Sequence, residues 1–108
     1  MPRQDYHKLV RDRIPDILQD YDIPHEIVTM DEASYAEALR RKLVEEAQEA
    51  AAADADLVTE LADLFEVIDA LLTLHGIDRQ TVLTQQTQRR DERGAFHQRW
   101  LLRWTEVH

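Results

Sequence analysis

Apolar residues recur at helical spacing along most of this chain. The longest stripe follows Asp31 and consists of positions four apart, which share one face of a helix: Tyr35, Leu39, Leu43 and Ala47. Asp31 is a typical N-cap residue, and the acidic Glu32 after it suits the first turn of a helix. The pattern therefore predicts a helix from this point to about Ala53.

A second apolar stripe begins after Asp56 and ends near His75. Its members are Leu57, Leu61, Leu64, Ile68, Leu71 and Leu72. The connection Asp54-Ala55-Asp56 is short and polar, so we expect the two helices to form an antiparallel hairpin. Asp56 is the expected N-cap of the second helix, and Gly76 the left-handed residue that closes it.

Shorter patterns predict the remaining elements. Pro15 favours the first turn of a short helix that reaches about Tyr21, and Asp78 can cap a third long helix that ends at Arg93 before Gly94. The β-branched residues in 25–29 and the pattern in 96–104 predict two short peripheral strands. Taken together, the elements predict an all-α helical bundle with one or two short strands, forming a single domain over residues 1–108.

Composition narrows the class of protein. The chain has 108 residues, 44% of them hydrophobic, and its formal net charge of -9 argues against a protein that grips a nucleic-acid polymer. Cysteine is absent, which excludes disulfides and thiolate zinc sites, and no apolar run is long enough to cross a bilayer. We expect a cytoplasmic protein with no membrane partner.

Four acidic residues interrupt the apolar stripes of the predicted hairpin: Glu46, Glu49, Glu60 and Asp63. If the turn is centred between Asp54 and Ala55, Glu49 faces Glu60 and Glu46 faces Asp63 at matching heights. Residues three apart on one helix lie on the same side, separated by about 4.5 Å along the axis. The spacing therefore predicts two vertical pairs of carboxylates that face each other.

The negative charge of such a cluster needs to be neutralised. Two carboxylates about 4 Å apart repel by about 4 kcal/mol at an effective dielectric constant near 20. Raised pKa values would relieve the repulsion, but hard oxygen ligands without His or Cys are what Mg²⁺ or Mn²⁺ prefers. The alternative interpretation is that these acids lie on solvated helix faces, where glutamate is simply a good helix former.

The acidic strings also resemble a family signature. Glu45-Glu46-Ala47-Gln48-Glu49, then ten residues, then Glu60-Leu61-Ala62-Asp63 is similar to the EExxE…ExxD signature of the all-α nucleoside triphosphate pyrophosphatases. That superfamily includes MazG-like proteins, phosphoribosyl-ATP pyrophosphohydrolase and dimeric dUTPases. The two ends of the chain, residues 6–15 and 89–96, resemble a small phosphoribosyl-ATP pyrophosphohydrolase-like branch of house-cleaning enzymes. One departure is Gly94-Ala95, where the family usually has two glycines.

The resemblance implies Mg²⁺-dependent hydrolysis of a nucleoside triphosphate, or a related phosphorylated nucleotide, to a monophosphate and pyrophosphate. It gives the metal-ligand role to Glu46, Glu49, Glu60 and Asp63. Glu45 matches the first acid of the signature and is the candidate for the base that takes a proton from the attacking water, or for a group that supports the ligands.

A triphosphate needs cations beyond the metal. Guanidinium and ammonium groups suit phosphate oxygens, and the chain supplies them near its acidic strings and in both flanks: Lys8, Arg11, Arg13, Lys42, Arg89, Arg90 and Arg93. Arg11 and Arg93 are the strongest candidates because they lie in the two family-like strings. Each of these residues is also interpretable as an ordinary surface charge.

Assembly and rival functions complete the predictions. Short helices leave apolar faces that one chain does not cover, and related folds associate, so we expect a homodimer or a higher homo-oligomer. Trp100 and Trp104 suit a core or a subunit interface better than a nucleobase platform. The rival functions are phosphoribosyl-ATP hydrolysis and a non-catalytic helical interaction module.

Overall fold

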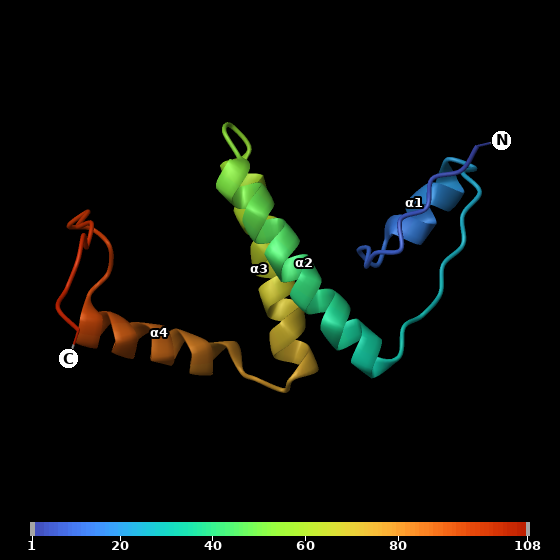
Figure 1. Ribbon diagram of the computed structural model, residues 1–108. Helices are drawn as coiled ribbons and strands as arrows, with labels where there is room; N and C mark the ends of the chain where they lie inside the picture. The colour runs from blue at the N-terminus through green and yellow to red at the C-terminus, as the bar shows by residue number, and fades with distance from the viewer. Residues whose placement is uncertain (1, 108) are drawn as a thin grey trace. The chain divides into compact units, whose positions relative to one another are not determined.

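The computed structural model describes residues 2–107, which form four helices and, within that range, no β-strand. The helices are α1 (Ile14–Asp20), α2 (Glu32–Ala52), α3 (Leu57–Leu74) and α4 (Arg79–Arg93). Figure 1 colours them in chain order. The chain divides into two compact units, the first ending at Gly76 and the second beginning at Ile77. The expected all-α class is confirmed.

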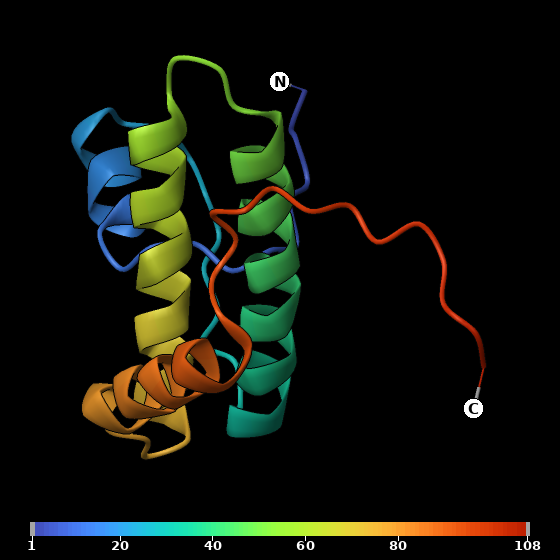
Figure 2. The ribbon, with the colours of Figure 1, turned by 90° about the vertical axis from the view of Figure 1, so that its left-hand side faces the viewer.

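Helices α2 and α3 form the predicted antiparallel hairpin, and they lie side by side in both views (Figures 1 and 2). Residues 53–56 connect them, so the turn is centred between Asp54 and Ala55 as expected. The core of this unit lies between the two helices, where Leu39 is 3% exposed and Val67 is 8% exposed. Both residues belong to faces that carry the acidic positions, so the packing that holds the hairpin also fixes the carboxylates.

The predicted caps have different outcomes. Asp31 is extended, and its side chain accepts a hydrogen bond of 2.7 Å from the Ser34 backbone N–H, which confirms it as the N-cap of α2. This hydrogen bond lowers the pKa of Asp31, although burial opposes the shift slightly. Asp56 occupies the predicted N-cap position of α3, but its side chain makes no cap hydrogen bond. Its φ of -93° and ψ of 14° are not extended, the conformation from which a cap side chain reaches back to the first turn.

The first unit begins with an irregular segment, which is followed by α1 and a second irregular segment. Helix α1 has Pro15 in its first turn, as predicted, and ends at Asp20. Asp22, with a φ of 53°, then turns the chain into a segment without regular structure that reaches Asp31. The strand predicted over 25–29 is therefore wrong. A β-branched sequence forms a stable strand only beside another strand, and no strand lies within the described residues to pair with it.

The second unit consists of α4 and an irregular C-terminal segment. The Asp78 side chain caps α4 by accepting from the Gln80 N–H at 3.0 Å, and Gly94 ends it with a φ of 81°. The strand predicted over 96–104 is absent. Trp100 is 87% exposed and Trp104 is also exposed, so neither packs into a core of this chain, and the subunit interface stays a prediction for them.

None of the helices within residues 2–107 combines the length and the hydropathy that crossing a membrane requires.

Candidate metal centre

The hairpin brings three of the four predicted carboxylates together. Glu46 and Glu49 lie one turn apart on α2, and Glu60 reaches them from the start of α3. One carboxylate oxygen from each residue lies within 4.8 Å of the others. We call Glu46, Glu49 and Glu60 the acidic cluster. Three oxygen donors at this separation can bind one hard divalent cation.

The acidic cluster is partly removed from water. Glu46 is 7% exposed, and Oε2 of Glu46 and Oε2 of Glu60 are buried without a hydrogen-bond partner. Burial raises the pKa of Glu46, the neighbouring charge of Glu49 raises it further, Lys42 opposes the shift, and Asp63 adds to it. Buried carboxylate oxygens without partners are costly to a fold, so the cluster is chemically suited to an added cation.

Asp63 lies beside the acidic cluster but has another partner. Its Oδ1 accepts a hydrogen bond from a terminal guanidinium nitrogen of Arg11 at 2.7 Å. These residues are 52 positions apart in the chain. The bond therefore fastens the segment before α1 to α3, next to the cluster. The predicted role of Asp63 as a metal ligand stays a prediction.

Lys42 connects the acidic cluster to Glu45. Its Nζ lies 3.5 Å from Oε1 of Glu46 and 3.7 Å from Oε1 of Glu45. Glu45 is thus outside the cluster by geometry but shares a cation with one of its members. Glu45 directly precedes Glu46, a predicted metal ligand, in the sequence.

The other predicted cations lie in different places. Lys8 is in the segment before α1, with Nζ 5.8 Å from the centre of the Tyr6 ring. Arg13 is exposed at the position that precedes α1. Arg90 and Arg93 lie in the last turn of α4, in the second unit, where positive charge complements the helix dipole. Arg89 precedes them on the same helix. Their roles as phosphate ligands stay predictions.

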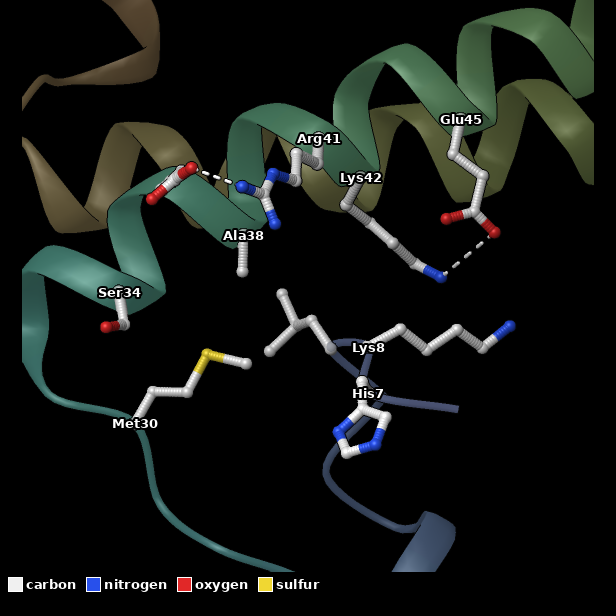
Figure 3. A pocket seen from close by; sticks show the side chains of 10 residues that line it. His7, Lys8, Met30, Ser34, Ala38, Arg41, Lys42 and Glu45 are labelled. Carbon is white, nitrogen blue, oxygen red and sulfur yellow. Dashed lines mark hydrogen bonds and ion pairs between the residues drawn. The ribbon is translucent and has the colours of Figure 1, made fainter. Parts of the chain in front are cut away.

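A cavity of about 250 Å³ lies between the segment before α1 and the first half of α2 (Figure 3). Its lining includes Lys8, Lys42 and Glu45, which the sequence singled out, and Met30 and Arg41, which it did not. No spacing in the sequence marks the latter pair, because Met30 precedes α2 in an irregular segment and Arg41 resembles any exposed helix residue. Only the folding of the N-terminal segment beside α2 reveals them.

Comparison with known proteins gives a family match. The chain matches the family model described as phosphoribosyl-ATP pyrophosphohydrolase over residues 4–90, a range that includes the acidic cluster, Arg11 and the cavity. Neither the curated proteins nor the solved structures include a match. On the strength of the family model, which spans most of its length, this chain belongs to the phosphoribosyl-ATP pyrophosphohydrolase family.

Proposed function

We propose that this protein is a divalent-metal-dependent nucleotide pyrophosphohydrolase. The reaction adds water across the bond between the α and β phosphates and releases a nucleoside monophosphate and pyrophosphate. The acidic cluster carries this proposal, because its two buried oxygens without partners are chemically incomplete without a cation. Family membership supports the reaction class.

Each acidic residue has a role in this proposal. Glu46, Glu49 and Glu60 would hold Mg²⁺, or Mn²⁺, and Asp63, which accepts from Arg11 in this structure, would be a further ligand. When bound, the ion polarises phosphoryl oxygens and lowers the pKa of water. Glu45 takes the proton of the attacking water, and the ion pair with Lys42 orients that carboxylate.

The cationic residues bind the phosphates. Lys8 and Lys42 line the cavity next to Glu45, where they can balance the negative charge of the substrate. Arg11 lies close enough to bond Asp63 and is positioned to exchange that carboxylate for a phosphate oxygen. Arg13, Arg90 and Arg93 are further candidates, from the segment before α1 and from α4.

Two substrate classes follow from this reaction. The family model favours phosphoribosyl-ATP, and the resemblance of the chain ends to a house-cleaning branch favours non-standard nucleoside triphosphates. Pyrophosphate release measured over a panel that contains phosphoribosyl-ATP and ribo-, deoxyribo- and oxidised triphosphates separates them. The panel member with the highest kcat/KM identifies the class.

We also propose that the protein works in the cytoplasm as a homodimer. Val58, Leu61 and Phe65 lie on one side of α3 and are exposed in the single chain. A second copy that covers this apolar side would remove it from water. The same helix carries Glu60 and Asp63, so association would stiffen the metal site.

Thermal melting tests the metal site directly. We expect the melting temperature of the wild type to rise on adding Mg²⁺ or Mn²⁺, since a ligand at 100 times its Kd stabilises the folded form by about 2.7 kcal/mol. Glu49→Gln should lose both this rise and pyrophosphate release. Glu66→Gln, which removes one exposed charge from α3 outside the cluster, is the matched control and should behave as the wild type.

The rival interpretation makes the opposite prediction. A non-catalytic interaction module would show equal melting temperatures with and without the cation, in the wild type and in both variants. That result, together with no pyrophosphate release from any member of the panel, would refute the enzyme proposal.

A further inference from the structure

The cavity beside α2 has two chemically different ends. Figure 3 shows the side chains of Lys8 and Lys42 extending in the same direction, toward Glu45. Met30 and Ala38 lie away from these ammonium groups, on the side where Ser34 and Arg41 also lie. Leu9 is a third apolar residue of the lining, and we call the part formed by Met30, Ala38 and Leu9 the apolar end. A polar, cationic end and an apolar end bordered by polar groups match the two ends of a nucleotide.

The polar end contains one lysine that lies outside the ion pairs of the cavity wall. Arg41 pairs with Glu37, and Lys42 pairs with Glu45 and Glu46. Lys8 forms no ion pair with a carboxylate among residues 2–107, and its Nζ lies 5.8 Å from the centre of the uncharged Tyr6 ring. An anion bound at this end therefore gains the Lys8 ammonium without breaking an existing pair.

Lys42 links this end of the cavity to the acidic cluster. Its Nζ contacts Glu46 of the cluster and Glu45 of the cavity wall. A phosphate bound beside Lys8 and Lys42 would therefore lie next to the acidic cluster, and the rest of a nucleotide would extend toward the other end of the cavity.

The apolar end is suited to a flat, weakly hydrated group. Met30 is flexible and polarizable and adapts to an aromatic face, while Ala38 leaves room beside α2. The volume of about 250 Å³ lies below the roughly 300–1,000 Å³ of a pocket that encloses a whole ligand. The cavity therefore has room for one part of a nucleotide rather than all of it.

We propose that this cavity is the nucleoside subsite of the enzyme, with the base against Met30, Ala38 and Leu9 and the adjoining phosphate between Lys8 and Lys42. The inference rests on the proposed function and extends it, because it places the part of the substrate that is not hydrolysed. Recognition of the base thereby depends on the segment before α1 and the start of α2, and not on the acidic cluster.

Calorimetric titration in Mg²⁺ tests the subsite without turnover. The probes are α,β-methylene-ATP, which resists cleavage between its α and β phosphates, and tripolyphosphate, which lacks the nucleoside. Ala38→Trp fills the apolar end and should weaken binding of α,β-methylene-ATP while leaving tripolyphosphate binding unchanged. Lys8→Ala should weaken both probes by about tenfold or more, the loss expected for one charge-assisted hydrogen bond.

Two controls separate a lost subsite from a lost fold. Arg40→Ala removes a positive charge from the same helix outside the cavity lining, and both probes should bind it as they bind the wild type. The rise of melting temperature with Mg²⁺ should persist in Ala38→Trp, because the acidic cluster is untouched.

Three results would overturn the subsite: no binding of α,β-methylene-ATP by the wild type, wild-type affinity of Ala38→Trp for it, or equal weakening of both probes by that variant. The proposed function fails by a different measurement, the absence of pyrophosphate release by the wild type. A protein that releases pyrophosphate and whose Ala38→Trp variant binds the analogue normally would retain the function and lose only this inference.

Discussion

Glu46 bears most of the electrostatic cost of the acidic cluster. It is the buried member of the acidic cluster, its Oε2 has no hydrogen-bond partner, and its pKa is raised above the ordinary value of 4.5 chiefly by burial. Two negative neighbours, Glu49 and Asp63, act in the same direction. The folded protein without metal therefore binds a proton at this position more tightly than the unfolded chain does.

The raised pKa of Glu46 gives a pH dependence with a definite sign. Stability from this group is fully present below pH 4.5 and is lost as the pH rises through its higher folded pKa. In chelator, we expect the wild type to lose stability relative to Glu46→Gln between pH 4.5 and neutral pH. Urea unfolding at a series of pH values measures this difference, and parallel curves for the two proteins would contradict it.

The lowered pKa of Asp31 gives a pH dependence of stability with the opposite sign. The Ser34 N–H lowers its pKa, so its contribution is present above the ordinary value of 3.8 and is lost as the pH falls through the lower folded pKa. Asp31→Ala should lower the melting temperature at pH 7, whereas Asp31→Asn should keep most of the stability because asparagine also caps helices. Circular dichroism melts measure both, and equal losses in the two variants would rule out the cap.

At the scale of single residues, the sequence predicts the site residues whose positions depend on local spacing along the chain. Helical periodicity places Glu46 and Glu49 on the same side of α2, and the short turn brings Glu60 of α3 beside them. The pairing of Asp63 with Arg11 was not predictable, because it depends on how a segment 52 residues away folds back on α3. Helical periodicity carries no information about such a contact.

At the scale of elements, the α2–α3 hairpin is the structure that makes the site. Its helices were predictable because long apolar stripes and flanking Asp31 and Gly76 agree on their ends. The two strand predictions failed because a strand depends on pairing with a partner strand, which local sequence does not reveal. A β-branched segment such as 25–29 has the right composition but lacks a partner.

The hairpin core is small enough for one residue to matter. Leu39 is 3% exposed, so Leu39→Ala should cost about 2–5 kcal/mol of unfolding free energy, a large share of the stability of a small domain. Denaturant unfolding monitored by circular dichroism measures the loss. Leu101→Ala, at an exposed position, should change the free energy by less than about 0.5 kcal/mol. Equal effects of the two substitutions would place the core elsewhere.

At the scale of the whole molecule, the chain buries little of its apolar surface. Among residues 2–107 only Leu39 and Val67 are buried hydrophobic residues, while large side chains such as Phe65, 55% exposed, remain accessible. Composition predicted a modest core but did not reveal how few apolar residues a single chain buries. The reason is physical: stripes on both sides of α3 are apolar, and α2 covers only one of them.

The proposed homodimer would cover apolar surface that a single chain leaves exposed. Phe65→Glu places a charge on the exposed side of α3 and should shift the protein from dimer to monomer, because burying an unpaired charge in an interface is costly. Light scattering after size-exclusion chromatography measures the mass. Val28→Glu, at another exposed apolar position, should leave the mass unchanged. A wild type that is monomeric at all concentrations would refute the dimer.

The bond between Arg11 and Asp63 gives the resting protein an internal counterion. If Asp63 serves as a metal ligand as proposed, it would have to release Arg11, whose guanidinium would then be available to a substrate phosphate. An uncharged residue at position 11 would in that case strengthen binding of the dication, because Asp63 would have no competing partner, and weaken binding of the nucleotide, because one phosphate ligand would be lost. In the wild type, binding of the dication and binding of the nucleotide would then favour each other.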